Sequence, residues 1–456
     1  MLTGQGELPA IGPTWTEKPH NEHKQRDPFA YRALLVFSIL YYTRPEDVIP
    51  GTAFLHVGKI AGGIALVALI ASLGTKKGRV KLPLEIKLLF LLLLQMCLTI
   101  PFAYWRGGAF HTVMDKFSKA VIVGLLISML VLSIAQLRKL LYVQAASVAT
   151  MTVVSLLIHR GGGRLTGALG GVFENPNELA INIALNFPFC AAFLLLARGP
   201  MKKGLWFLGI LGMLYGVMAT YSRSGFLALA IGAAIALWEF GIRGRRLGLV
   251  FLSAVAALTL LLIGPSHYLA RLETIVTMRE DIDPNGKLMS GDSSEARRDL
   301  LKESLKVMTH NPLFGVGPGN FEVVSGNWHV AHNTYTQLGA EAGIPALVLF
   351  IAIVALAYRN LSRTQKLLRH HPRDAELLIL TGGLMSSLGA YLVGAFFADT
   401  AYHLFPYYLV AYTSAIYRIA SNSSSEKPGQ TKVPGLLESN QRTYGQGTKT
   451  EPAWTR

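Results

Sequence analysis

The sequence predicts an all-α protein that crosses a membrane many times. Hydrophobic residues make up 51% of the 456 residues and charged residues only 15%, a balance too apolar for a soluble chain of this size. The apolar blocks run close to the roughly 20 residues that a helix needs to cross ~30 Å of hydrocarbon. They do not alternate over about ten residues, as the strands of a membrane barrel do. We therefore expect a polytopic helical protein with about twelve spans.

The expected spans follow one another through short loops, with one long polar interruption. They occupy residues 29–42, 52–74, 84–104, 117–134, 140–158, 179–197, 205–221, 225–240, 247–264, 344–358, 377–397 and 402–419. The chain thus divides into a polar N-terminus (1–28), nine helices (29–264), a long polar loop (265–342), three helices (343–420) and a polar tail (421–456). Both ends lack apolar periodicity, so we expect them to be disordered, and residues 1–28 contain no removable signal peptide.

The basic residues indicate which side of the membrane each loop faces. The formal net charge is +16, but it does not indicate nucleic acid as a partner, because the bases cluster in alternate short loops. Cytoplasmic loops are rich in Lys and Arg. With both termini inside, the inner loops carry Lys76, Lys77, Arg79, Lys81, Arg138, Lys139, Arg198, Lys202, Lys203, Arg243, Arg245, Arg246, Arg359, Arg363, Lys366, Arg369 and Arg373. This arrangement places the loop 265–342 outside the cytoplasm.

The long loop contains a predicted helix with one arginine on its apolar face. Ser293 or Ser294 is a suitable N-cap, and the helix would run to about Met308. At 100° per residue, Arg297 falls near the centre of the apolar face and Arg298 at its edge. That face comprises Leu300, Leu301, Leu305, Val307 and Met308. A charge there needs an anion or a buried partner, which is either a bound ligand or a carboxylate such as Glu295 or Asp299.

A second arginine, Arg223, lies in a turn between two spans on the same outer side. Hydroxyl groups flank it in the segment Thr220-Tyr221-Ser222-Arg223-Ser224-Gly225. It could be an arginine that extends to the membrane boundary. Together with Arg297, it could instead form a bidentate seat for phosphate oxygens.

His332 begins the polar entry into the tenth span, which is predicted from residue 344. Asn333, Gln337 and Glu341 follow at every fourth position, so they form a polar stripe that must face a cavity or partner helices. A histidine accepts a proton near neutral pH, which suits His332 to act as general base on a hydroxyl group. The structural alternative is that His332 caps the helix and Glu341 braces its neighbours.

Two other motifs in the loop have mainly structural interpretations. Gly315-Val316-Gly317-Pro318-Gly319 lacks the Lys-Ser/Thr ending of a phosphate-binding loop, so we interpret it as a tight turn. Asp281 to Asp292 has the spacing of a calcium loop but lacks the usual final Glu, and a solvated turn is the simpler interpretation. The sequence predicts no metal site.

These motifs, in this order around one long loop, resemble the O-antigen ligase and O-antigen polymerase family of bacterial lipid-linked glycan ligases. The resemblance is carried by the Tyr221-Ser222-Arg223-Ser224-Gly225 turn, by Arg297 ahead of Asn311-Pro312-Leu313-Phe314-Gly315-Val316-Gly317, and by His332-Asn333-Thr334-Tyr335 with Gln337, Glu341 and Gly343. It is strongest over residues 171–351.

The resemblance implies a metal-independent, cofactor-free, inverting glycosyltransferase of the C-type fold in the bacterial inner membrane. Its donor would be a glycan on undecaprenyl pyrophosphate at the periplasmic face, as in lipopolysaccharide biosynthesis. Arg223 and Arg297 match the arginines that hold the pyrophosphate, and His332 matches the histidine that activates the acceptor. Supporting positions would be Asn333, Gln337, Glu341, Tyr335 and Asn177.

The acceptor stays open at this point. A core glycolipid, a growing polysaccharide and a protein hydroxyl would each present an alcohol to the same base, so ligase, polymerase and protein O-oligosaccharyltransferase activities are alternatives. A different class is a transporter that binds an anionic substrate through its outer arginines. Such transporters are commonly built from internal repeats, and the two halves of this chain show no repeat.

Overall fold

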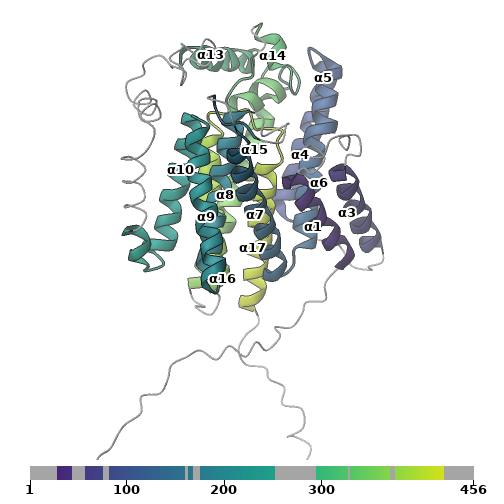
Figure 1. Ribbon diagram of the computed structural model, residues 1–456. Coiled ribbons are helices and arrows are strands. Elements are labelled where there is room, and N and C mark those ends of the chain that lie inside the picture. Colours follow the sequence, from purple (N-terminus) through teal and green to yellow (C-terminus); the bar gives the residue numbers. More distant parts are fainter. Residues whose placement is uncertain are drawn as a thin grey trace, which may run out of the picture.

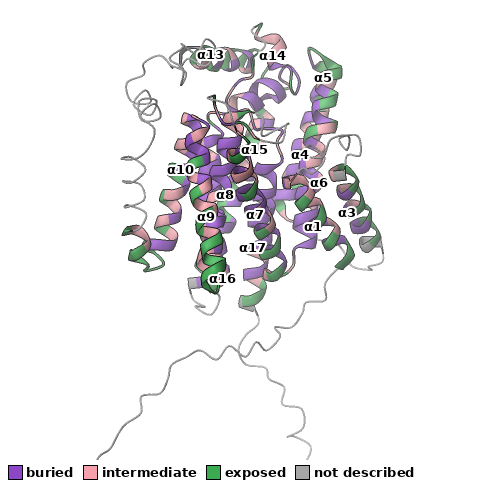
Figure 2. Ribbon diagram, in the orientation of Figure 1, coloured by how far each residue is buried: buried purple, intermediate pink, exposed green. Residues whose placement is uncertain are grey.

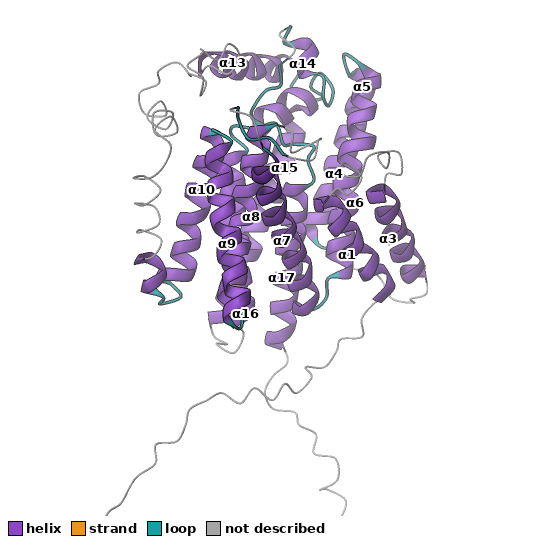
Figure 3. Cartoon of the chain, in the orientation of Figure 1, coloured by secondary structure: helices purple, strands orange, loops and turns teal. Residues whose placement is uncertain are grey.

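The computed structural model describes residues 28–43, 57–74, 82–159, 163–167, 175–251, 294–326, 329–369 and 375–425. Within these ranges the chain consists of helices and loops, and no strand occurs among them (Figure 3). The calcium-like segment 281–292, most of the predicted span 247–264, residues 1–27 and residues 426–456 lie outside the described residues. The predicted start of the disordered tail at residue 421 is wrong, because the last helix continues to Ser425. The predicted all-α class is confirmed.

Six of the described helices are long and apolar enough to cross a membrane. They are Leu84–Phe102 (α4 with η2), Ile134–Ile158 (α7), Pro176–Leu196 (α8), Arg223–Ile242 (α10 with η5), Thr334–Leu368 (within α15) and Ala375–Gly394 (α16). Five more of the expected spans coincide with the helices α1 (Pro28–Thr43), α3 (Val57–Gly74), α6 (Ser118–Leu130), α9 (Pro200–Ala219) and α17 (Phe405–Ser425). The number of twelve crossings stays a prediction.

The structure corrects two predicted boundaries: the start of the fourth span and the start of the fifth. The α5 helix (Arg106–His111) and the π-helical η3 (Thr112–Phe117) continue directly into α6, so the helical stretch begins well before residue 117. The α7 helix begins at Ile134 because Ser133 and Gln136 cap each other's backbone N–H groups. Arg138 and Lys139 therefore lie in the first turns of α7 and not in the loop where the sequence analysis placed them.

The helices form one bundle with two distinct ends (Figure 1). At one end, Arg138 near the start of α7 pairs with Glu376 in the first turn of α16, with 3.1 Å between Nη1 and Oε1. Arg243, just after η5, donates to Gln365 near the end of α15 at the same end of the bundle. The first turns of α8, α10 and α15 lie at the opposite end, where α13 (Ser294–His310) and α14 (Phe321–Val324) cover the bundle.

Burial follows the layering of the bundle (Figure 2). α8 and α16 are central, with 72% of the apolar window of each buried inside the protein. Apolar side chains on the outer helices are exposed, among them Val67 on α3, Leu208 on α9 and Val348 on α15. Such a belt of exposed apolar residues is what a bundle presents to lipid.

Candidate functional site

His332 is held in an unusual backbone conformation directly ahead of α15 (Thr334–Arg369). Its φ is 48°, in the left-handed region that costs non-glycine residues about 1–3 kcal/mol and that is frequent at functional sites. The cap of α15 is Asn333, whose Oδ1 accepts from the N–H groups of Tyr335 at 3.0 Å and Thr336 at 3.1 Å. The structural alternative for His332, a helix cap, is thus a role that Asn333 performs.

The loop between α16 and α17 lies along the beginning of α15 and is tied there through Thr334. The Thr334 N–H donates to Ala395 O at 2.8 Å, and its hydroxyl donates to Ala398 O at 2.7 Å. The same hydroxyl accepts from the Thr400 N–H at 3.0 Å. Since Thr334 and Thr400 are both fully buried, these bonds are shielded from water and fix the path of the loop.

This loop brings an acid to His332 that the sequence analysis did not identify. Asp399 Oδ1 lies 4.0 Å from His332 Nδ1, and the two side chains are 18% and 20% exposed. At 4.0 Å the two groups form an ion-pair contact and not a hydrogen bond. A carboxylate on the Nδ1 side of an imidazole stabilises the protonated ring, and Nε2 is left to accept the proton. The only sequence signal for Asp399 is an isolated acid in an otherwise apolar region.

The polar stripe of α15 is buried against protein, as predicted. Gln337 Oε1 accepts from the Ala401 N–H at 3.3 Å. Glu341, only 3% exposed, accepts from the Tyr402 hydroxyl at 2.6 Å and from the backbone N–H groups of Gly319 and Phe321 at 3.0 and 3.1 Å. These contacts favour the bracing interpretation of Glu341.

Tyr335 is a further packing residue beside this stripe. Its hydroxyl donates to Leu392 O on α16 at 3.2 Å, and its ring lies 4.6 Å from that of Phe396 between centroids. Tyr335 therefore anchors the start of α15, three residues after His332, to the end of α16.

The glycine-rich turn wraps around a kink in α15. Gly343 has a φ of 83° and interrupts the helix, and a Cβ at this position would collide with Leu313 O. Val316 and Gly317 donate their N–H groups to Ala340 O and Glu341 O at 2.9 and 2.8 Å. The predicted tight turn is confirmed, and it fixes the end of α13 against α15.

Arg297 lies on the face of α13 that packs against the bundle, and Arg298 is exposed, as the helical periodicity predicts. The Nε atom of Arg297 is shielded from solvent. The predicted apolar face is only partly right, because Leu301 and Leu305 are 37% and 42% exposed. The buried side instead contains Leu300, Ser304 and Val307, and its two apolar residues, Leu300 and Val307, pack with Phe321, Ala331 and Ala340.

Arg223 is the first residue of α10, beside the first turn of α8. Ser222 caps α10 by accepting from the Gly225 N–H at 3.1 Å. Gly225 is needed there because a Cβ would collide with Ala180 of α8. Arg223 lies next to this close contact, at the same end of the bundle as His332, and it is half-buried.

Asn177, a predicted supporting residue, is bound to a third arginine. Arg164 donates from Nη2 to Asn177 Oδ1 at 2.6 Å and from Nε to Thr220 O at 2.9 Å. Arg164 thereby joins the start of α8 to the turn that precedes Arg223. No local pattern in the sequence indicates this role for Arg164, because its partners lie 13 and 56 residues away along the chain.

Further ionisable groups surround Asp399. His403 Nδ1 lies 3.9 Å from Glu178 Oε2, and burial lowers the pKa of His403 to about 4. A lowered pKa makes His403 a weaker base than an ordinary histidine. Burial, and next the nearby Asp399 carboxylate, raise the pKa of Glu322. Lys116 of η3 is close enough to interact with His403 and Glu322.

No group of three or more His, Cys, Asp or Glu side chains that could hold a metal ion occurs in the described part of the chain. The chemistry available at this end of the bundle is that of a His–Asp pair together with arginines.

The Thr334 network can be tested by a nearly isosteric change. Thr334→Val leaves the Thr400 N–H without its acceptor inside the protein, which costs about 1–3 kcal/mol. We expect a lower Tm in a fluorescence thermal-shift measurement on the detergent-purified protein, together with reduced activity. Thr336→Val is the matched control, because among the described residues the Thr336 hydroxyl makes only one hydrogen bond, a long one of 3.5 Å to Asn333 O. Equal Tm values for the two variants would contradict a fixing role for Thr334.

The fold and the site together define the class: a polytopic helical membrane protein with a polar, ionisable cluster at one end of its bundle. Residues 208–351 match the family model Wzy_C, O-antigen ligase, which confirms the resemblance over a range that includes Arg223, Arg297 and His332. This family match implies an enzyme of the lipid-linked glycan ligase or polymerase type. No curated protein matches the chain.

Proposed function

We propose that the protein transfers a glycan from undecaprenyl pyrophosphate to an acceptor hydroxyl on the periplasmic face of the bacterial inner membrane. The observation that carries this proposal is the His332–Asp399 pair, 4.0 Å apart, at the end of the bundle where α10 and α13 present Arg223 and Arg297. A base with an orienting acid suits activation of a hydroxyl, and guanidinium groups suit a pyrophosphate.

In the proposed reaction His332 Nε2 accepts the proton of the acceptor hydroxyl as its oxygen attacks the anomeric carbon. The new bond joins that oxygen to the anomeric carbon, and the bond from the carbon to the pyrophosphate oxygen breaks. The leaving group is undecaprenyl pyrophosphate, and its added negative charge is stabilised by Arg223 and Arg297. A single in-line displacement inverts the anomeric centre. The proton on His332 then passes to solvent.

Asp399 has the role of a positioning residue in this scheme. It orients the His332 ring through Nδ1 and stabilises the imidazolium that forms. A substitution that removes this carboxylate and leaves the fold intact should lower kcat and leave donor binding unchanged.

Asp399→Asn is accordingly expected to lower kcat by about 10²-fold or more with little change in KM for the lipid-linked donor. Asp399→Glu should recover part of the rate, because it restores the charge. The measurement is steady-state transfer in proteoliposomes, with Glu322→Gln as the control for an acid at the same end. A proportional loss of stability and donor affinity in Asp399→Asn would indicate a structural residue instead.

The acceptor separates the activities within this class. Our first choice is ligation to a glycolipid, and the second is polymerisation or transfer to a protein hydroxyl. The purified protein should be incubated with a radiolabelled lipid-linked donor and the three acceptor types in turn. Label on the glycolipid supports ligase activity, and label on a longer glycan or on protein assigns one of the alternatives.

A transporter of an anionic substrate is the alternative in a different class. It predicts uptake of labelled donor across the bilayer without any new covalent product. Transfer in the same vesicles, abolished by His332→Ala, would exclude it.

A further inference from the structure

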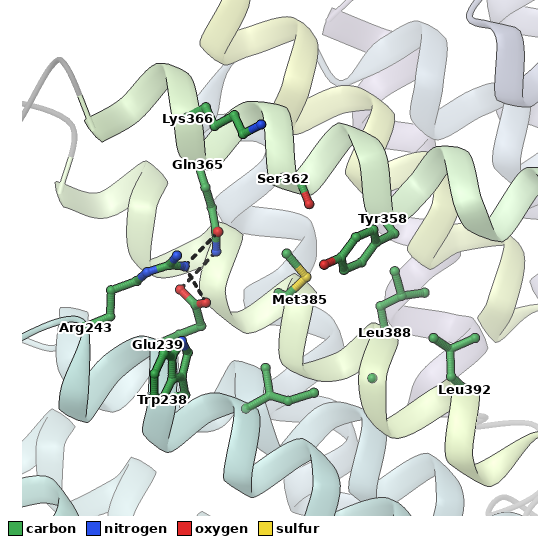
Figure 4. Close-up of a pocket in the computed structure, with 12 residues that line it drawn as sticks. Trp238, Glu239, Arg243, Tyr358, Ser362, Gln365, Lys366, Met385, Leu388 and Leu392 are labelled. Atoms are coloured by element: carbon green, nitrogen blue, oxygen red, sulfur yellow. Dashed lines mark hydrogen bonds and ion pairs between the residues drawn. The ribbon is translucent and has the colours of Figure 1, made fainter.

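A second candidate site lies away from His332, in a cleft of about 490 Å³ between α10 with η5, α15 and α16 (Figure 4). The cleft runs toward the end of the bundle where α15 finishes, since Lys366 lines it. One wall is apolar and is formed by Met385, Leu388 and Leu392 of α16, all of which point into the cleft from one helix.

The only acid that lines the cleft within the described chain is neutralised by the protein itself. Glu239, on the π-helical η5 (Leu237–Ile242), has an 8% exposed side chain. Arg243 donates to its Oε1 at 2.6 Å and Gln365 donates to its Oε2 at 2.9 Å. Arg243 also donates to Gln365 Oε1 at 2.8 Å, which closes the triad. A paired carboxylate of this kind does not repel an anion in the cleft.

The opposite side of the cleft presents hydrogen-bond donors at regular intervals. Tyr358, Ser362 and Lys366 of α15 are four residues apart and all line the cleft. Figure 4 shows Tyr358 and Ser362 directed toward α16, with Lys366 lying along α15 at the end of the cleft. Trp238 of η5 adds an indole N–H at the rim. Within the part of the chain that the structure describes, none of these four side chains has a hydrogen bond or an ion pair. Tyr358 and Trp238 are 56% and 55% exposed, although both are large aromatic residues.

The cleft is charged at the Lys366 end and apolar along the α16 wall, which suits an amphiphilic ligand. Lys366 lies about 12 Å from Tyr358 along the helix axis, at 1.5 Å per residue, and the apolar wall continues beyond Tyr358. Two further bases, Arg245 and Arg246, follow η5 at this end of the bundle. Basic residues at a membrane boundary attract anionic lipid headgroups, and aromatic residues anchor at the same depth.

We propose that this cleft binds one anionic phospholipid from the leaflet opposite the glycan-transfer site. Lys366 would pair with the headgroup phosphate, Ser362 and Tyr358 would donate hydrogen bonds to it, and an acyl chain would lie along Met385, Leu388 and Leu392. An isoprenoid chain alone would leave the donor stripe unused, and a free phosphate would leave the apolar wall uncovered. The proposal does not depend on which reaction the protein catalyses.

The test is native mass spectrometry of the full chain with phosphatidylglycerol. We expect one retained lipid per protein, no comparable retention of phosphatidylcholine, and no displacement by millimolar inorganic phosphate. Lys366→Glu should weaken phosphatidylglycerol binding about tenfold, since it removes one attraction and adds one repulsion. Arg363→Glu is the matched control, because Arg363 makes the same charge change on the same exposed part of α15 outside the cleft.

A double variant, Ser362→Ala with Tyr358→Phe, keeps the test decisive if Lys366→Glu does not fold, and it should weaken binding about fivefold. Equal loss of binding in Arg363→Glu would overturn the proposal, because the attraction would then be general. Equal retention of phosphatidylcholine would overturn headgroup recognition. Displacement by inorganic phosphate, or preferential retention of a polyprenyl phosphate, would overturn the identity of the occupant.

Discussion

Replacing His332 with alanine is expected to lower the rate of glycan transfer by about 10²- to 10⁴-fold, the usual contribution of a general base. The protein should still insert into the membrane and bind the lipid-linked donor, because Asn333 and Thr334 carry the hydrogen bonds that fix the start of α15. The measurement is single-turnover transfer from a labelled donor in proteoliposomes, with donor binding measured separately.

His329→Ala is the matched control for this prediction. His329 lies three residues before His332 and is exposed, so its loss should leave transfer within about twofold of the unmodified protein. Full activity in His332→Ala would remove His332 as the base. The neighbouring His403 is not a substitute, because burial keeps its pKa at about 4.

Replacing either Arg223 or Arg297 with alanine should weaken donor binding and reduce transfer, by about 10²- to 10³-fold in rate for each residue. Each guanidinium would stabilise charge on the pyrophosphate in the ground state and more strongly as that group leaves. Lysine at either position should recover only part of the effect, because an ammonium group lacks the planar fork that binds two phosphate oxygens.

Arg298→Ala provides the control, since Arg298 is the next residue on α13 and is exposed. Its loss should leave both binding and transfer unchanged. Loss of transfer in Arg223→Ala or Arg297→Ala with undiminished donor binding would contradict a role in holding the pyrophosphate. Binding can be followed by native mass spectrometry with the lipid-linked donor, independently of turnover.

Local patterns in the sequence predict the helices and the side of α13 that carries Arg297, because both depend on periodicity within one segment. The same reasoning is wrong for Leu301 and Leu305. Hydrophobicity suggested that they face the bundle, but the buried face contains Ser304, which is fully buried and small enough for close packing. The start of α7 is predicted at residue 140, because the charges of Arg138 and Lys139 indicate a loop, whereas the Ser133 cap starts the helix at Ile134.

Asp399 could not be predicted, because its relation to His332 depends on contacts between segments more than 60 residues apart. Nothing in the local pattern of the loop after α16 indicates that Thr334 will bind it. The same holds for Arg164, whose partners Asn177 and Thr220 belong to two different helical segments. Sequence therefore predicts candidate chemical groups, and tertiary packing decides which of them become neighbours.

The late position of Asp399 also has a consequence for biosynthesis. The ribosome produces Arg223, Arg297 and His332 well before the loop that holds Asp399 and Thr400, and this loop can reach α15 only after α16 has inserted. A nascent chain that ends between α15 and α16 would thus contain every residue of the 208–351 match and still lack the acid beside His332. Without this acid, such an intermediate should transfer glycan more slowly than the complete protein, until α16 and the loop after it are in place.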